Sequence, residues 1–168
     1  MLPTIRMPPR MPLTYFGGQR YRDPYQWIVQ LPIALVQTDG SFHQRNRSGA
    51  VAAILDLPVG SKHQFVNPLY ALESSTEAEW ASVYYGLSLA TNMDQRIIGL
   101  ENDCLGVVQN ILFNRPNRHE YARYYNHKIQ GLAQKTDWCG IRWIPRGLNK
   151  ADRLFHPGLK KNSNVLLY

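Results

Sequence analysis

Cysteine is scarce in this sequence, which limits the chemistry available to it. The 168 residues include two cysteines, Cys104 and Cys139, and their spacing is not that of a metal-binding motif. Two cysteines also cannot build the set of cross-links that stabilises small secreted domains. We therefore expect reduced thiols in an intracellular protein, without a disulfide framework.

Long apolar stretches are missing as well. The sequence has no continuous run of about 18 apolar residues, the length that a membrane-spanning helix needs. Near the N-terminus, Pro3, Pro8, Pro9 and Pro12 interrupt the short apolar segments, which is unlike a signal peptide. These absences predict an intracellular protein, cytoplasmic or associated with the nucleoid.

Acidic residues are also few. The chain has 12 Asp and Glu against 19 Lys and Arg, a net charge of +7. Such a charge favours polyanionic partners, of which nucleic acid is the commonest, although many small basic proteins bind none. In this setting an acid inside an apolar segment needs a physical reason. A bound metal ion supplies one, because it offsets the repulsion between grouped carboxylates.

The composition divides the chain into three parts. Residues 1–30 hold five of the eleven prolines together with several arginines and aromatic residues. Because recurring proline prevents helix formation, we expect an extended N-terminal arm that can contact a protein partner, with a disordered basic tail as the alternative. Residues 31–160 are expected to form one α/β domain, and residues 161–168 a short C-terminal tail.

Hydrophobic periodicity predicts the elements of this domain. An antiparallel meander of three strands is expected first, over 31–39, 49–57 and part of 63–72, with an Arg-rich hairpin turn over 43–48. The later elements alternate between helix and strand, which implies parallel pairing. They are a helix over 76–93, a strand over 96–103, helices over 104–113 and 119–135, a strand over 140–145 and a short helix over 149–155.

Two acids occupy equivalent places in this pattern. Asp39 ends the first expected strand before Gly40, and Asp103 ends the fourth before a helix. Taken singly, Asp39 is more simply explained as a turn former and Asp103 as a helix N-cap. Together they are less ordinary, since neighbouring strand ends in one sheet bring such side chains close and form the usual sites of α/β proteins.

Two further acids are candidates. Glu79 shares one face of its expected helix with small and apolar residues, and a carboxylate on a packing face needs a partner. Glu77 is its rival, although its spacing from Ser74 matches a capping box; helical phase alone does not decide between them. Asp152 follows the last strand, where the helix dipole alone would favour an acid.

Five short motifs around these acids occur in a recognisable order. They are Asp39-Gly40-Ser41, Ala78-Glu79-Trp80 with Gly86-Leu87, Asn102-Asp103-Cys104, Ile144-Pro145-Arg146 and Asn149-Lys150-Ala151-Asp152. In this order and these settings the motifs resemble the ribonuclease H family, most closely its archaeal and plant-like members. Each motif is weak alone, but together, over residues 33 to about 157, they are specific.

The resemblance implies an α/β fold with a ribonuclease H-like five-stranded mixed sheet, three antiparallel strands and then parallel additions, flanked by helices. It implies a metal-dependent endonuclease that hydrolyses the RNA strand of RNA–DNA hybrids by a two-metal-ion mechanism. Asp39, Glu79, Asp103 and Asp152 would be the catalytic residues and the ligands of two Mg²⁺ ions, for which Mn²⁺ can substitute. Asp39 would bridge both ions, and Asp152 would complete the shell of one.

The matching segments also contain the candidates for substrate binding. These are Gly40, Ser41, Arg146, Asn149 and Lys150. A basic side chain in this set would bind phosphate with a strong dependence on salt.

The chain departs from the family at three places. Cys104 stands where the family often has Ser or Thr, and the stretch between Phe113 and Tyr121 is too short for the basic protrusion of bacterial members. His156 is a loose candidate for the histidine that helps product leave. Because one fold serves many functions, a nuclease acting on DNA or junctions and an inactive nucleic-acid-binding module are the alternatives.

Overall fold

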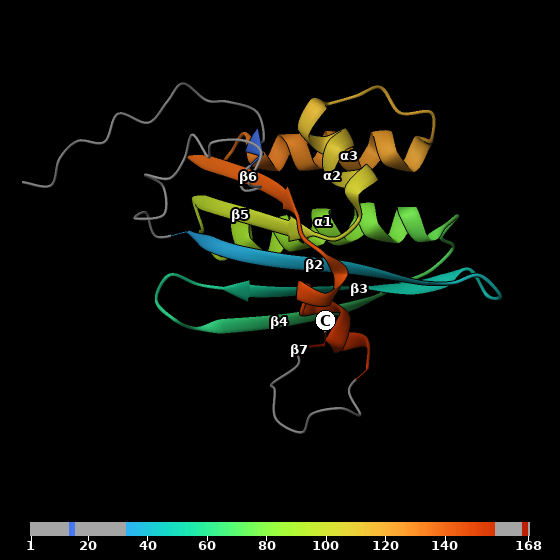
Figure 1. The fold of residues 1–168 in the computed structure, drawn as a ribbon, viewed down its shortest axis with the longest axis horizontal. Helices are drawn as coiled ribbons and strands as arrows, with labels where there is room; N and C mark the ends of the chain where they lie inside the picture. Colours follow the sequence, from blue (N-terminus) through green and yellow to red (C-terminus); the bar gives the residue numbers. More distant parts are fainter. Residues whose placement is uncertain (1–13, 16–32, 157–165, 168) are drawn as a thin grey trace, which may run out of the picture.

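The computed structural model describes residues 14–15, 33–156 and 166–167. Its strands form one mixed sheet in the spatial order β1-β6-β5-β2-β3-β4-β7 (Figure 1). Five strands make up the body of this sheet: β2 (Ala34–His43), β3 (Ser48–Asp56), β4 (Lys62–Leu69), β5 (Ile97–Asn102) and β6 (Trp138–Trp143). Strands β2, β3 and β4 pair antiparallel, whereas β5 pairs parallel with both β2 and β6. The expected five-stranded mixed sheet is therefore confirmed.

Two strands of two residues each extend this sheet at its edges. β1 (Thr14–Tyr15) pairs parallel with β6, and β7 (Leu166–Leu167) pairs parallel with β4. The rest of the expected N-terminal arm and of the C-terminal tail lies outside the described residues.

The helices follow the expected order. They are α1 (Ser75–Asn92), α2 (Leu105–Phe113) and α3 (Glu120–Ala133), followed by two short 3₁₀ helices, η2 (Arg146–Leu148) and η3 (Ala151–Phe155). The short helix expected over 149–155 is the 3₁₀ helix η3, which begins two residues later, after the buried Asn149 that donates to Thr38 O of β2; η2 precedes it and was not expected. Among the described residues, no helix combines the length and the apolar composition needed to cross a membrane.

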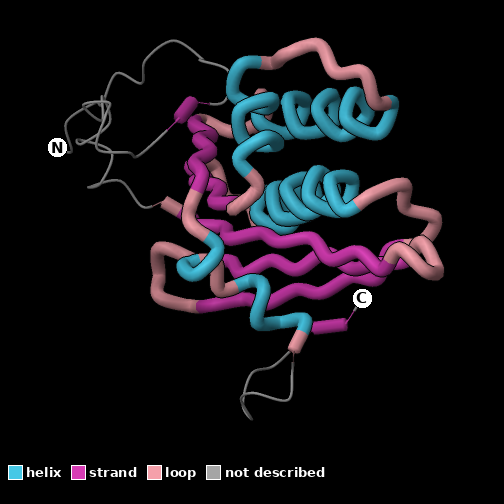
Figure 2. Tube along the Cα trace, turned by 45° about the vertical axis from the view of Figure 1, so that its right-hand side comes forward, coloured by secondary structure: helices cyan, strands magenta, loops and turns pink. Residues whose placement is uncertain are grey.

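Helices α1 and α3 cover one face of the sheet, as the views in Figures 1 and 2 show. The main core lies between α1 and the sheet, where Val36 and Leu55 from the strands meet Val83 and Leu87 from the helix. On the opposite face, η3 packs its Ala151 against Ile54 of β3 in a second, smaller cluster. The sheet is thus covered on both faces near β2 and β3.

Glycine allows α1 to lie directly on β2. A Cβ atom on Gly40 would fall 2.4 Å from the backbone carbon and oxygen of Ala78, and one on Gly86 would fall 2.4 Å from Thr38 Cγ2. The expectation that this strand ends at Asp39 is wrong, because β2 continues through Gly40 to His43 and the turn covers 44–47. The close contact at Gly40 brings the first turns of α1 against the middle of β2.

Candidate active site

Asp39 lies inside a strand. It pairs with Ala52 across β2 and β3, and it is 6% exposed. The explanation of Asp39 as a turn former fails at this position, because the strand continues for four residues beyond it. A nearly buried carboxylate of this kind needs a compensating partner.

Glu79 and Glu77 have different environments on α1. The backbone N–H of Glu77 donates to Ser74 Oγ at 3.2 Å, and Glu77 Oε2 accepts from the backbone N–H of Glu73 at 2.6 Å. Glu77 therefore completes a capping box, with the return bond shifted by one residue from the usual pattern. Glu79, one half-turn further along, lies beside Asp39 instead.

Asp103 follows β5 directly. Thr38 of β2 and Asn102 of β5 are partners in the parallel register, so Asp39 and Asp103 follow equivalent positions of two adjacent strands. The N-cap of α2 is Cys104, without a side-chain cap bond, so Asp103 does not serve as the cap. The indole N–H of Trp143 donates to the backbone oxygen of Asp103 at 2.9 Å.

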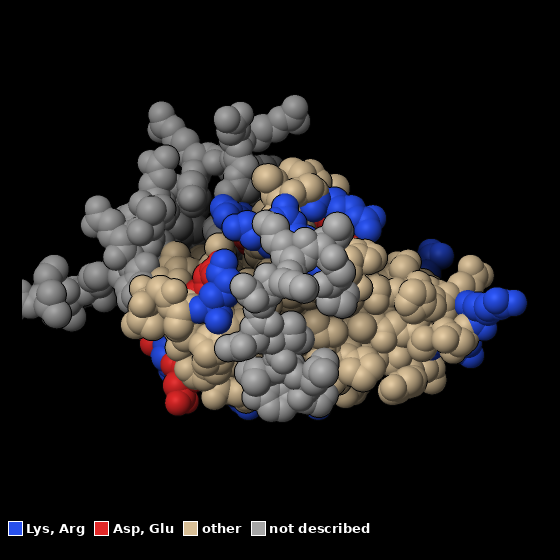
Figure 3. Space-filling view, turned by 90° about the horizontal axis from the view of Figure 1, so that it is seen from below, with Lys and Arg blue, Asp and Glu red and all other residues tan. Residues whose placement is uncertain are grey.

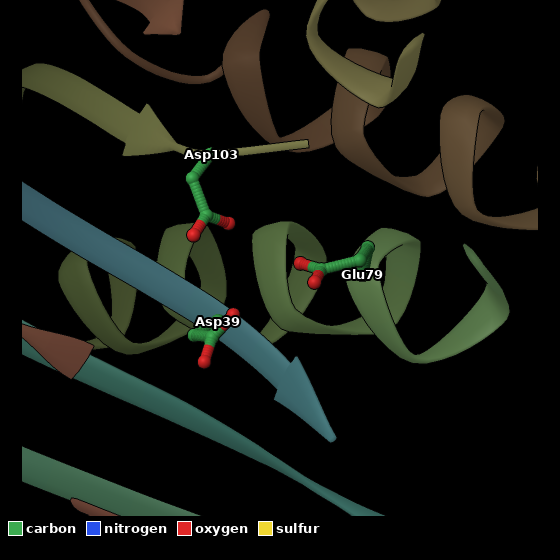
Figure 4. A group of neighbouring side chains, drawn as sticks. All are labelled: Asp39, Glu79 and Asp103. Carbon is green, nitrogen blue, oxygen red and sulfur yellow. The ribbon is translucent and has the colours of Figure 1, made fainter. Parts of the chain in front are cut away.

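These three carboxylates meet in space. Each of Asp39, Glu79 and Asp103 offers an oxygen, and these atoms all lie within 4.8 Å of one another. Figure 4 shows the three side chains entering one space from β2, from α1 and from the end of β5. A grouping of oxygen atoms at this separation can hold a divalent metal ion.

Asp152 lies at the margin of this group. It sits on η3, close enough to Asp39 for its charge and a side-chain hydrogen bond to raise the Asp39 pKa, but it is not among the three carboxylates within 4.8 Å. Arg146 lies 3.7 Å from Asp152, between Nη2 and Oδ1. The fourth predicted acid is thus beside the cluster and paired with an exposed cation.

Burial and mutual repulsion shift the titration of this group. Burial, then the charges of Asp103 and Asp152, raise the pKa of Asp39 from 3.8 to about 7. Burial, then the charge of Asp39, raise the pKa of Glu79 from 4.5 to about 8, against the lowering effect of the Asn102 amide. Burial likewise raises the pKa of Asp103. Arg146 lowers the pKa of Asp39 and of Asp103, but burial outweighs its effect, and a bound cation would favour the ionised forms.

The acids line an open pocket of about 570 Å³. Among the described residues, Arg146 is the one Lys or Arg in its lining, and His43 and His156 also reach it. The remaining lining comes from β2, the start of α1, the β5–α2 turn and η3. Its residues are Asp39, Gly40, Ser41, Phe42, Ser75, Glu79, Asp103, Cys104, Asp152 and Phe155.

The predicted substrate-binding residues are placed differently from one another. Ser41 and Arg146 line the pocket, although Ser41 Oγ also accepts from Ala50 N at 3.1 Å. Lys150 is exposed, outside the lining, with its backbone N–H on Gln37 Oε1. Asn149 is 3% exposed and donates to Thr38 O at 2.8 Å, and its side chain also hydrogen-bonds to Asp103, so it contacts both β2 and the acidic group. Gly40 lines the pocket and also allows α1 to approach.

Two buried polar residues near the site had no predicted role. Asn102 is fully buried behind Glu79, and Glu101 is 3% exposed in a pair with Arg142. Gln37 Nε2 also donates to Glu101 Oε2 at 2.7 Å. The sequence did contain a signal for them, because Glu101 and Asn102 are polar residues at the end of an otherwise apolar strand.

The donor set fits a hard divalent cation. The grouped ligands are carboxylate oxygens, which Mg²⁺ and Mn²⁺ accept, and no cysteine or histidine belongs to the group found among the described residues. Burial raises the pKa of both Asp39 and Glu79, and a bound cation would offset this effect by favouring the ionised forms. The structure therefore places a metal-compatible acidic cluster in an open pocket at the end of the sheet.

A family model described as reverse transcriptase-like matches residues 37–154. The matched segment extends from β2 to η3, and it contains Asp39, Glu79, Asp103 and Asp152. No curated protein matches the chain in sequence.

Solved ribonuclease H structures are similar to this one. The ribonuclease H1 of the halophilic archaeon Halobacterium salinarum NRC-1 has a TM-score of 0.65 at 18% identity, over 71% of this chain and 90% of that chain. The N-terminal ribonuclease H domain of a Mycobacterium tuberculosis protein has a TM-score of 0.62 at 18% identity, over 73% and 95%. LC11 ribonuclease H1, solved with an RNA/DNA hybrid, has a TM-score of 0.63 at 14% identity, over 72% and 92%. At these identities the likeness shows the fold.

Proposed function

Because this chain belongs to the reverse transcriptase-like family and has the ribonuclease H fold, we propose that it is a metal-dependent endonuclease that hydrolyses the RNA strand of RNA–DNA hybrids. One observation carries the proposal: three carboxylates from β2, α1 and the end of β5 gather within 4.8 Å in an open pocket of a basic protein. The similar LC11 protein was solved with such a hybrid, which supports this choice of substrate.

The four acids have distinct roles in this proposal. Asp39, Glu79 and Asp103 would hold one Mg²⁺ ion, and Asp39 and Asp152 would hold a second. When bound, such a pair of ions supplies an activated water and stabilises the leaving oxygen of a phosphodiester. The protein's part is to keep the carboxylates grouped, which their attachment to packed elements achieves, whereas the bound cations would favour their ionised forms.

Basic side chains around the pocket would hold the substrate backbone. Arg146 faces the pocket and is paired with Asp152 at 3.7 Å, a weak ion pair in an exposed position. A substrate phosphate would compete with that carboxylate for the guanidinium, which forms strong charge-assisted bonds with phosphate oxygens. Lys150, exposed in the adjacent segment, would add to the phosphate attraction.

A panel of labelled substrates tests the proposal. The full chain is incubated with Mg²⁺, Mn²⁺ or EDTA and with an RNA–DNA hybrid, double-stranded RNA, double-stranded DNA or a four-way junction. We expect cleavage of the RNA strand of the hybrid with Mg²⁺ or Mn²⁺ and none in EDTA. Arg146→Ala should weaken hybrid binding and reduce its salt dependence, whereas Arg96→Ala, paired with Asp137 on the surface, serves as the matched loss of one exposed charge.

The other outcomes distinguish the alternatives. Cleavage of the junction or of double-stranded DNA in place of the hybrid would keep the acidic site and replace the substrate. Binding of the hybrid in EDTA, without cleavage of any substrate in Mg²⁺ or Mn²⁺, would identify an inactive binding module and refute the enzymatic proposal.

A further inference from the structure

Asn102 is a fully buried side chain beside the acidic cluster. It is the last residue of β5 and precedes Asp103 in the chain. A primary amide has two N–H donors and one carbonyl acceptor, all of which must be satisfied when it is buried. The hydrogen bonds of Asn102 therefore identify the groups that satisfy its buried amide.

The amide nitrogen of Asn102 reaches α1 and β2. It lies 3.2 Å from Glu79 Oε2, 3.1 Å from both Thr38 O and Thr38 Oγ1, and 3.4 Å from Ser82 Oγ. Thr38 directly precedes Asp39. One nitrogen atom thus contacts both the carboxylate of Glu79 and the backbone next to Asp39.

The other groups of Asn102 fix the segment that carries Asp103. Its Oδ1 accepts from Cys104 N at 2.8 Å, across Asp103 itself, and its backbone oxygen accepts from Ile144 N at 3.1 Å. Asn102 is therefore hydrogen-bonded to β2, to α1 and to the turn after β5, the three segments that carry the clustered carboxylates.

We propose that Asn102 is a positioning residue that holds the carboxylate of Glu79 in its metal-binding orientation. The inference rests on the proposed function and adds to it a residue that touches neither substrate nor metal. The bond occupies Oε2 of Glu79 and fixes a side chain that has several rotatable bonds, leaving Oε1 free of this contact.

An amide suits this role better than a charged donor. A buried Lys or Arg in its place would neutralise Glu79 and compete with the cation, whereas an amide donates a hydrogen bond and leaves the negative charge available. Hydrogen-bond partners that orient metal ligands typically change metal affinity by about 10- to 100-fold when removed.

The test measures Mn²⁺ binding to the full chain without nucleic acid, by the electron paramagnetic resonance signal of free Mn²⁺. We expect Asn102→Ala to weaken Mn²⁺ binding on the order of 10-fold. The matched control is Thr38→Val, which keeps the shape of a buried side chain and removes its hydroxyl contact with the same amide, leaving the bond to Glu79. We expect Thr38→Val to lower the melting temperature and to retain wild-type Mn²⁺ affinity.

A second measurement does not need an Asn102 variant to fold. In ¹⁵N-labelled wild-type protein, the side-chain amide resonance of Asn102 should shift on addition of Mg²⁺, because its acceptor carboxylate becomes a ligand. The same addition to Glu79→Ala should leave that resonance in place. Absence of the shift in the wild type, or an equal shift in both proteins, overturns the inference.

The outcomes separate this inference from the proposed function. Equal Mn²⁺ affinity of wild type and Asn102→Ala, with hybrid cleavage intact in the wild type, refutes the positioning role alone. Failure of the wild type to bind Mn²⁺ refutes both. An equal loss of affinity in Thr38→Val and Asn102→Ala would show a general structural effect and also refute the positioning role.

Discussion

At the scale of residues, the site groups carboxylates in a place where burial disfavours their ionised forms. Asp39 is nearly buried and Glu79 half-buried, so both are disfavoured as anions. The charges of Asp103 and Asp152 make Asp39 harder to ionise, and the charge of Asp39 does the same to Glu79. A protein without a use for these carboxylates would be more stable with neutral residues of the same size. Their presence in a chain that has few acids is therefore best explained by a bound cation.

Asp39→Asn is the substitution that tests this most directly. The amide keeps the shape of the side chain and removes the anionic charge that holds the metal, so hybrid cleavage should be abolished while the fold is retained. Cleavage assays with Mg²⁺ and a circular dichroism spectrum check the two parts. An Asp39→Asn variant that unfolds, or that cleaves at the wild-type rate, would count against Asp39 as a metal ligand.

Glu79 and Glu77 provide a matched pair on one helix. Glu79→Gln should lose hybrid cleavage because a neutral amide is a poor ligand for Mg²⁺. Glu77→Gln should keep cleavage and lose at most about 1 kcal/mol of stability, since Gln can still accept at the capping position. Single-turnover cleavage and thermal unfolding of both variants separate these effects, and inactivity of Glu77→Gln in a folded state would contradict the assignment.

The sequence singled out the four acids and Asn149, but not the hydrogen bonds that the amides beside the acids make. Asp39, Asp103 and Asp152 were candidates because each lies at the end of a strand or after one. Helical phase alone did not separate Glu79 from Glu77, and the resemblance to the ribonuclease H family selected the four acids together. The contacts of Asn102 and Asn149 could not be predicted. Both donate to Thr38 O, and that convergence depends on the register of β2 with β5 and on the path of the η2–η3 segment.

At the scale of elements, the approach of α1 to β2 sets the distance between Glu79 and Asp39. The two glycines at this contact, Gly40 and Gly86, come from different elements and face different partners. The Asp-Gly pair at 39–40 predicted a turn, because that pair is common in turns. The glycine is needed instead because the backbone of Ala78 leaves no room for a Cβ atom at this position. A local sequence pattern cannot reveal such a long-range contact.

Gly40→Ala should therefore damage both fold and site. The added Cβ would fall 2.4 Å from the Ala78 backbone, which cannot move without shifting α1. We expect a loss of about 1–3 kcal/mol of stability and a marked loss of Mn²⁺ affinity. Gly131→Ala is the control: the new Cβ meets nothing within 4 Å in α3, and a gain of up to about 1 kcal/mol is expected. Urea unfolding of both variants measures the difference, and equal stabilities would refute the packing argument.

At the scale of the whole molecule, an acidic pocket lies in a basic protein. The chain carries a net charge of +7, yet four of its 12 acidic residues line one pocket where the sheet, α1 and η3 meet. On the face in Figure 3, Lys and Arg side chains lie along the upper margin and at the right-hand end, over the β2–β3 hairpin. This arrangement attracts a polyanion over long range, while a bound cation would be needed to bring phosphate up to the carboxylates.

The same charge arrangement links stability to pH and to metal. The pKa values of Asp39 and Glu79 in the folded protein, about 7 and about 8, exceed their ordinary values of 3.8 and 4.5. At pH values between the ordinary pKa values and those of the folded protein, the folded state binds protons that the unfolded state has released. The contribution of these two acids to stability must therefore fall as the pH rises from about 4 to about 8.

A divalent cation should reverse this trend, because it binds the ionised carboxylates of the folded state. In EDTA we expect the wild type to lose on the order of 1–2 kcal/mol more stability than Asp39→Asn between pH 5.5 and pH 8. Mn²⁺ should raise the melting temperature of the wild type more at pH 8 than at pH 5.5, and should raise that of Asp39→Asn little at either pH. Thermal unfolding of both proteins at the two pH values, with Mn²⁺ and with EDTA, provides the comparison. Equal responses of the two proteins to Mn²⁺ would show that the cation binds elsewhere, because the linkage requires the charge of Asp39.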